Sequence, residues 1–407
     1  MSTTVSDTDI PGHTVVPPRT MFSILGAISL CHLMNDMLQA LLPAIYPILK
    51  GGFDLSFAQI GLLTLTYQVT ASVLQPVVGY YTDERPQPYW LPFGMLATLL
   101  GILTVSMAPH YAELLMGAAM MGVGTSIFHP ESSRIARVAS GGRHGLAQSL
   151  FQVGGNFGQA LGPLLAAFLI LPFGRHSLAW FALVAIAGMA LLSGLGHWYK
   201  SNGHAKPRQR RPAGVAPPFS RAEVARGLTL LILLIFSKYF YVASISNYYM
   251  FYLMHRFHLS TQAAQVDLFL FLAATASGII GGGMIGDRFG RRLIIWLSIV
   301  GVLPFTLALP YVGLDTTIVL TILIGLVLSS AFPAILVYAQ ELLPGRTGMV
   351  AGLFFGLAFG IAGAGAGVLG MLADWTGIET VYKICAFLPA IGLVAMFLPD
   401  VAKRKPA

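Results

Sequence analysis

The stretch Gly283-Met284-Ile285-Gly286-Asp287-Arg288-Phe289-Gly290-Arg291-Arg292 joins two long apolar segments and decides the fold. It places three arginines and one aspartate in a connection so short that the flanking helices must turn back on each other. Gly286 and Gly290 allow the two backbones to approach closely at this turn. The arginines indicate the cytoplasmic side of a membrane. Any basic loop between two membrane helices would look similar, so the stretch needs support from elsewhere in the chain.

A second copy of this pattern lies 204 residues earlier in the chain. Gly79 and Asp83 precede Gly283 and Asp287 by the same offset, which indicates two halves with the same order of helices. Pro86 stands where the pattern has its last glycine. We therefore expect the loop in the second half to carry more of the function of this pattern.

The composition is that of a membrane protein. Of the 407 residues, 56% are hydrophobic and 10% are charged, and the mean hydropathy is +0.73. A soluble domain has about a quarter charged residues. The net charge of +8 does not indicate nucleic-acid binding, because the basic residues lie between apolar segments, where membrane orientation requires them. Cys31 and Cys385 lie inside apolar segments and predict no disulfide framework.

Twelve apolar segments are long enough to span a bilayer, which takes about 20 helical residues. They lie near 21–49, 57–80, 89–108, 111–138, 145–172, 177–198, 226–254, 263–286, 292–312, 315–342, 347–373 and 380–399. The sequence therefore predicts an all-α membrane protein with twelve transmembrane helices in two six-helix, pseudo-symmetric halves. We divide the chain into a cytoplasmic tail, an N-terminal bundle, a basic cytoplasmic linker, a C-terminal bundle and a second tail: 1–20, 21–198, 199–225, 226–399 and 400–407.

The distribution of basic residues predicts the orientation. Of the 24 Lys and Arg residues, 19 lie in the tails and loops of one side, four lie in the opposite loops, and Lys238 lies within a span. Because Lys and Arg are enriched on the cytoplasmic side, we expect both termini in the cytoplasm.

The first span carries four polar residues on one helix face: His32, Asn35, Asp36 and Gln39. A charged side chain within a span costs at least about 2.5 kcal/mol to insert, so this face must point into the bundle. A low-dielectric cavity disfavours an ionised carboxylate, which suits Asp36 to bind and release a proton. The alternative is a buried cluster that only fixes helix packing.

The fourth span contains a second group of polar residues, His129-Pro130-Glu131, followed by Arg134. Pro130 predicts a bend in the helix. Glu131 is our second candidate for the proton site, but it lies three residues from Arg134 and could equally form an interfacial ion pair. His129 lies deeper and titrates near neutrality, so both a proton relay and a hydrogen-bonded core histidine stay open.

Lys238 lies about a dozen residues into the seventh span, too deep to reach an interface easily. A lone lysine beside aromatic rings is suited to bind an anion, although it could instead neutralise Asp36 or Glu131 across the halves. Together with groups of the first span, it completes our set of substrate-site candidates: Lys238, His32, Asn35, Gln39, Tyr239 and Tyr241.

Several motifs of other protein classes are absent from the sequence. No glycine is followed by lysine, so a nucleotide-binding loop of an ATP-driven pump is excluded. Neither His-Glu-x-x-His nor Gly-x-Ser-x-Gly occurs, so the sequence gives no support for a metalloprotease or a serine hydrolase. We expect a protein that is not an enzyme and that has no cofactor and no resident metal ion.

The loop at 283–292 resembles the signature loop of the major facilitator superfamily. Longer stretches resemble the fosmidomycin-resistance transporters within it: 128–134, 141–145, 151–158, 236–241 and 338–346, with His32, Asn35 and Asp36. Gly158, Gly162 and Pro163 allow close helix packing and partly resemble the Gly-Pro motif of drug–proton antiporters in this family.

The resemblance implies proton-coupled export of a small anionic phosphonate drug such as fosmidomycin by alternating access, and hence antibiotic resistance. It also implies a cytoplasmic latch formed by Asp83, Asp287, Arg288 and Arg291. We expect a monomer whose partners are a small-molecule substrate, protons and the lipid bilayer, and not nucleic acid. Two alternatives remain: a symporter that imports an organic anion, and a membrane sensor that transports nothing.

Overall fold

The computed structural model describes residues 20–84, 87–141, 143–202, 219–289, 291–343 and 347–399, and within these ranges it leaves out some side chains, including 280–289. The described chain is helical throughout and contains no strand. Twelve of its helical segments are long and apolar enough to cross a membrane. The predicted fold class is confirmed.

The N-terminal half contains six spans, several of them built from more than one helical segment. They are α1 (Phe22–Ala44) with α2 (Tyr46–Phe53), α3 (Phe57–Glu84), α4 (Trp90–Met107), α5 (Tyr111–Ala139), α6 (His144–Leu165) with the π-helical turn η1 (Ala166–Ile170) and α7 (Leu171–Phe173), and η2 (Arg175–Phe181) with α8 (Ala182–Asn202).

The C-terminal half contains the other six spans. They are α9 (Arg221–Phe257), α10 (Thr261–Phe289), α11 (Arg291–Val300) with α12 (Leu303–Ala308) and η3 (Leu309–Tyr311), α13 (Leu314–Ser329) with α14 (Ala331–Leu342), α15 (Thr347–Thr376), and α16 (Ile378–Cys385) with η4 (Leu388–Phe397).

Proline explains several breaks within segments that are predicted to be continuous helices. The first span is interrupted at Ile45, two residues after Pro43, and the ninth is interrupted just before Pro304. A proline removes one backbone hydrogen bond and clashes with the preceding turn, so the helix bends or restarts there. The predicted ranges therefore gave the number of spans correctly but missed these interruptions.

Helix α9 is the longest element, with 37 residues. At 1.5 Å per residue it is about 55 Å long, well beyond the roughly 30 Å hydrocarbon core of a bilayer. Its first turn is fixed by a capping box, in which the Ser220 side chain accepts from Glu223 N–H and the Glu223 carboxylate accepts from Ser220 N–H. Most of the predicted linker lies outside the described residues, so the division into five segments stays a prediction.

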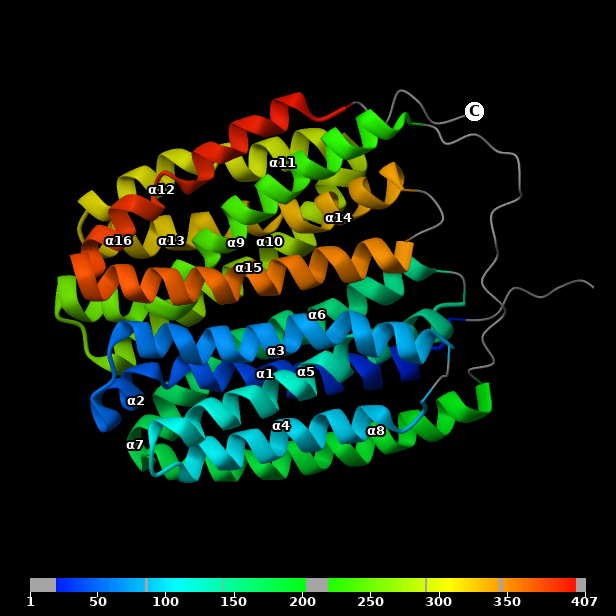
Figure 1. The fold of residues 1–407 in the computed structure, drawn as a ribbon, viewed down its shortest axis with the longest axis horizontal. Coiled ribbons are helices and arrows are strands. Elements are labelled where there is room, and N and C mark those ends of the chain that lie inside the picture. The colour runs from blue at the N-terminus through cyan, green and yellow to red at the C-terminus, as the bar shows by residue number, and fades with distance from the viewer. Residues whose placement is uncertain are drawn as a thin grey trace, which may run out of the picture.

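The two halves meet along α3 and α15, which lie side by side in Figure 1, and along α6 and α10. Small residues permit this contact: a Cβ at Gly61 would meet the carbonyl oxygen of Ala366, and a Cβ at Gly370 would meet that of Phe57. Cys31 and Cys385 are unpaired and are 0% and 1% exposed.

Candidate functional site

The polar face of α1 is buried inside the molecule. His32, Asn35, Asp36 and Gln39 are 1%, 0%, 2% and 7% exposed. Helix α6 packs closely against this face because it presents glycines: a Cβ at Gly155 would overlap the His32 ring. Gly158 and Gly162 similarly face Leu33 and Ala40 of α1, so these two glycines and Pro163 lie at the α1–α6 contact.

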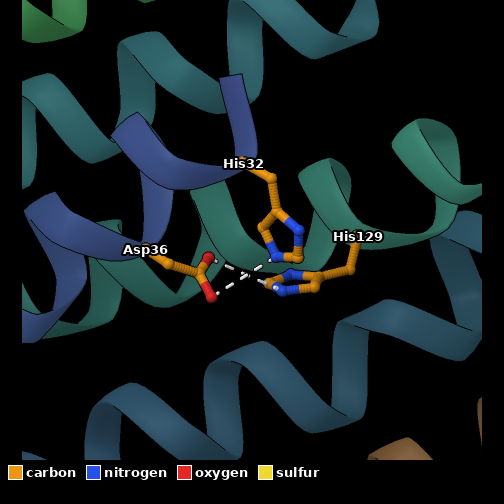
Figure 2. A group of neighbouring side chains, drawn as sticks. All are labelled: His32, Asp36 and His129. Carbon is orange, nitrogen blue, oxygen red and sulfur yellow. Dashed lines mark ion pairs between the residues drawn. The ribbon is translucent and has the colours of Figure 1, made fainter. Parts of the chain in front are cut away.

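His32, Asp36 and His129 form one cluster, which we call the triad (Figure 2). His32 Nε2 lies 3.3 Å from Asp36 Oδ2, and His129 Nε2 lies 3.7 Å from Asp36 Oδ1. His129 comes from α5, so helix packing brings it to a carboxylate 93 residues earlier in the chain. From the sequence we expect His32 at the substrate and His129 at the proton, whereas the structure brings both to the same carboxylate.

Backbone carbonyls determine which nitrogen of each histidine faces Asp36. His32 Nδ1 lies 2.7 Å from Phe151 O, and His129 Nδ1 lies 3.2 Å from Thr125 O. A carbonyl oxygen can only accept, so each Nδ1 carries the hydrogen and a neutral ring has none on Nε2. The triad therefore turns two bare nitrogens toward a carboxylate, and acceptors facing one another in a buried site require at least one shared proton or another cation.

Two amide side chains complete the surroundings of Asp36. Asn35 Nδ2 donates to Oδ1 at 3.1 Å, and Gln159 Nε2 of α6 donates to Oδ2 at 2.9 Å. Gln39 lies further along α1 and accepts from the Tyr67 hydroxyl of α3 at 2.5 Å. Gln159 is not among the residues predicted from the sequence, because an uncharged amide within a span is not by itself a functional signal. Its position beside Gly155 and Gly158, the glycines of α6 that pack against α1, is the signal that indicates it.

The donor set of the triad is also one that can hold a transition-metal ion. Its two imidazole nitrogens and one carboxylate oxygen lie within 4.8 Å of one another. Histidine and carboxylate are common ligands of such ions, and a carbonyl on the second ring nitrogen is the usual support. The amide hydrogen bonds that Asp36 already accepts serve an ionised carboxylate equally well without a metal ion.

Glu131 and Arg134 form an ion pair on α5, with 3.6 Å between Oε1 and the guanidinium. The guanidinium also donates to the carbonyl and the hydroxyl oxygen of Thr82 near the end of α3, the latter at 2.9 Å. Glu131 is 2% exposed. The structure thus holds this carboxylate in a network that joins α5 to α3, separate from the triad.

Lys238 is buried in the C-terminal half, with 5% of its surface exposed. Its ammonium donates to Ser329 O at 3.4 Å and lies 5.4 Å and 5.5 Å from the ring centres of Tyr239 and Phe332. Among the side chains that the structure describes, none brings a carboxylate within ion-pair distance of it. Tyr241 does not share this environment, because it is buried near Cys385.

The predicted cytoplasmic latch lies outside the described residues. This holds for the side chains of all four of its members, Asp83, Asp287, Arg288 and Arg291.

The structure does describe contacts between the halves at the opposite ends of the helices. Phe57 N–H and Ala58 N–H, at the start of α3, donate to the Asp374 carboxylate of α15 at 2.8 Å and 2.7 Å. Thr64 of α3 donates to Asn247 of α9 at 2.6 Å. These hydrogen bonds close the two halves on the side away from the linker.

Comparisons with known proteins confirm the family. The chain matches the Major Facilitator Superfamily model over residues 28–367 and 268–407. It is 58% identical over 382 residues to the fosmidomycin resistance protein of Escherichia coli strain K12, covering 94% of each chain. It is 42% identical over 391 residues to the uncharacterized MFS-type transporter YfnC of Bacillus subtilis strain 168, covering 96% of each.

Solved structures show the same fold at low sequence identity. A bacterial homolog of the human lysosomal transporter Spinster, inward-facing and occupied, aligns with a TM-score of 0.75 at 14% identity, covering 96% of this chain and 100% of that one. The E. coli fucose:proton symporter FucP aligns with a TM-score of 0.66 at 16% identity, covering 94% and 100%. The protein is therefore a multi-pass membrane transporter and not an enzyme, and the chain belongs to the major facilitator superfamily, in the group that includes the fosmidomycin resistance protein.

Proposed function

We propose that the protein exports a small anionic compound from the bacterial cytoplasm in exchange for protons, by alternating access. One observation carries the proposal: two groups of opposite character are buried in opposite halves, the triad and Lys238. The 58% identity to a protein named for fosmidomycin resistance supports a substrate of the phosphonate class that includes fosmidomycin. We place the protein in the bacterial inner membrane. Both termini lie in the cytoplasm, as the basic residues predict.

Asp36 is the proton site in this proposal. Its carboxylate lies between two imidazole nitrogens that carry no hydrogen when their rings are neutral, so gaining or losing a proton changes the whole triad. His32 and His129 share the proton with it. Glu131 stays the second candidate, but its ion pair with Arg134 favours a fixed role in joining α5 to α3.

Lys238 binds the anionic group of the substrate. Its ammonium has three N–H donors, and in the described structure it forms one hydrogen bond, to a carbonyl oxygen, and contacts two aromatic rings. A buried cation without a carboxylate is costly, and a bound anion would offset that cost. The remaining candidates for contacts with the substrate are Asn35, Gln39, Tyr239 and Tyr241.

Alternating access requires that one side close while the other opens. The contacts of Asp374 and Asn247 close the side away from the linker in this structure. We propose that the latch of Asp83, Asp287, Arg288 and Arg291 closes the cytoplasmic side in the opposite state. Gly158, Gly162 and Pro163 keep α1 and α6 packed as one unit while the halves move. The protein works as a monomer without a cofactor.

Reconstituted vesicles test the proposal. With an imposed pH gradient, the wild-type protein is expected to move fosmidomycin against its concentration gradient, and Asp36→Asn is expected to abolish this movement. The matched control is Asp315→Asn, which removes an exposed carboxylate at the start of α13. Normal gradient-driven transport by Asp36→Asn would remove Asp36 from the mechanism.

The same vesicles separate the two alternatives. A symporter would accumulate the anion when protons and substrate move in the same direction, so reversing the gradient in oriented vesicles distinguishes import from export. A sensor without transport activity would give no flux in either direction and would tolerate Lys238→Ala.

A further inference from the structure

Four amide side chains lie along one face of α6: Gln148, Gln152, Asn156 and Gln159. The neighbouring face carries Gly155 and Gly158, which pack against α1. Phe157 is 53% exposed and marks the side of α6 that faces lipid. Because Gln159 is two positions further along, it points to the opposite side of the helix, toward the interior of the molecule.

Gln159 connects a buried site with this interior space. Its side chain is exposed, although it faces away from the lipid, and its Nε2 donates at 2.9 Å to a carboxylate that is 2% exposed. In the described structure, no group forms a hydrogen bond with its Oε1. One end of the amide therefore contacts Asp36, and the other end is available to a molecule between the halves.

The charge of Asp36 dictates which end of the amide faces it. An ionised carboxylate only accepts hydrogen bonds, so it requires the NH2 group and leaves Oε1 toward the interior. A carboxyl protonated on Oδ2 donates through its O–H. When this O–H points to the amide and not to Nε2 of His32, the favourable partner is Oε1 and the amide turns its NH2 group inward. In that state the interior surface presents a donor where it had an acceptor.

The other groups around Asp36 do not provide this connection. His32 from α1 and His129 from α5 are the titratable groups within ion-pair distance of it. Tyr67 of α3 approaches the same region but donates to Gln39. Among the described side chains of α4 and α8, none forms an ion pair with Asp36. Gln159 is the contact from α6, the helix that also packs against the other half through α10.

We propose that Gln159 couples the protonation of Asp36 to substrate binding, and that the substrate carries a hydroxyl or N–H group in addition to its anionic group. This rests on the proposed export function. With Asp36 ionised, Oε1 of Gln159 accepts from the substrate hydroxyl or N–H while Lys238 holds the anion. When Asp36 gains a proton, the amide turns, two donors face each other, and the substrate is released. This order is the one that exchange of substrate for protons requires.

The first test separates coupling from binding in reconstituted vesicles, with fosmidomycin as the probe. Gln159→Leu is expected to slow equilibrium exchange of labelled fosmidomycin about tenfold, because it removes one substrate contact, but not to abolish it, because exchange needs no net proton movement. Gradient-driven export is expected to fall at least about tenfold further than exchange, because export also loses the coupling to Asp36. Gln262→Leu, an exposed glutamine at the start of α10, is the matched control.

Gln159→Glu provides a second test, the pH dependence of export, which would not change if Gln159 had a purely structural role. Gln159→Glu places a second carboxyl beside Asp36, and two close carboxyls share a proton because both cannot be ionised easily. The pH profile of export is therefore expected to shift to higher pH. An unchanged profile in Gln159→Glu overturns the proposal, as does wild-type driven export in Gln159→Leu or an equal loss of exchange and export in that variant.

The substrate class is tested with two phosphonates of equal length, one with and one without a terminal hydroxyl. Wild-type protein is expected to prefer the hydroxylated compound at least about tenfold, because a site built to pair with a hydroxyl rejects the analogue without it. Gln159→Leu is expected to lose most of this preference. Equal preference in both proteins overturns the substrate assignment. If the wild type moves no fosmidomycin at all, the export function itself fails, which is a different outcome from failure of coupling.

Discussion

Single atoms of the histidine rings set the properties of the triad. Phe151 O accepts a hydrogen bond from Nδ1–H of His32, and Thr125 O accepts one from Nδ1–H of His129. Both Nε2 atoms are therefore directed at Asp36. The His32 ring also stacks on Phe151, with 4.0 Å between the ring centres. A side chain held by both a hydrogen bond and a stacked ring can change its proton without changing its position. This is why we assign His32 to the proton rather than to the substrate.

Gly155 provides the space that the His32 ring occupies, so a larger side chain at this position should disturb the ring. Gly155→Ala is expected to displace the His32 ring and to destabilise the protein by roughly 1–3 kcal/mol, the usual cost of overpacking a core. Thermal unfolding in detergent measures the effect. Gly194→Ala is the control, because a Cβ there meets no atom within 4 Å. Equal melting temperatures for the two variants would contradict the role of Gly155.

Lys238 gives a second prediction at this scale. Lys238→Ala is expected to weaken the binding of fosmidomycin at least about tenfold, because it removes the cation that an anionic group pairs with. Ligand-induced stabilisation of the purified protein measures the affinity. Lys383→Ala removes an exposed lysine from α16 and is expected to leave binding unchanged. Identical affinities for the wild type and Lys238→Ala would exclude Lys238 from the substrate site.

At the scale of elements, α3 begins on a carboxylate supplied by the other half of the protein. The first N–H groups of a helix have no partner within it, and an acidic side chain there is favourable for both hydrogen bonding and the helix dipole. Asp374 meets this requirement from the end of α15, because α3 and α15 run in opposite directions. The start of one helix is thereby tied to the end of another 317 residues away.

Removal of this carboxylate should loosen the first turn of α3. Asp374→Ala is expected to cost about 1 kcal/mol at this contact, as loss of a helix cap usually does, and to speed amide exchange in the first turn of α3 severalfold. Hydrogen–deuterium exchange measured by mass spectrometry reports it directly. Glu379→Gln removes an ion pair with Arg256 inside one half and serves as the control. If α3 exchanges at the same rate in both variants, Asp374 does not close this side.

The number of membrane-spanning helices could be predicted from the sequence, whereas the helix interruptions and the contacts between helices could not. Long apolar segments gave twelve spans, because lipid permits little other than helices of that length. The interruption at Ile45 was missed, because Pro43 by itself does not reveal where a helix restarts. The meeting of His32 with His129 depends on the packing of α1, α5 and α6. Asp374 was missed because its partners are backbone N–H groups, which no side-chain motif indicates.

The two halves of the molecule contain different buried ionisable groups. The N-terminal half holds the triad, and the C-terminal half holds Lys238 with Tyr239 and Phe332. Phe128 and Phe332 stand 204 residues apart, at the offset of the predicted repeat, and Phe128 lies beside His32 of the triad while Phe332 lies beside Lys238. A common fold thus accommodates the triad in one half and a buried lysine in the other.

The susceptibility of whole cells to fosmidomycin tests the proposed export. Deletion of the gene is expected to lower the fosmidomycin concentration that stops growth, because the compound then accumulates inside. The wild-type gene on a plasmid should restore resistance, and an Asp36→Asn gene expressed at the same membrane level should not. Unchanged susceptibility after deletion, in cells shown to produce the protein, would exclude fosmidomycin as a substrate that matters in the cell.

The positions of the two cysteines have a practical consequence for following the transport cycle. Cys31 and Cys385 are almost completely enclosed by neighbouring side chains. Maleimide dyes and spin labels should therefore leave the natural protein unmodified. A single cysteine introduced at an exposed position would then be the one labelled site. Movements of this transporter can then be recorded without first rebuilding its interior.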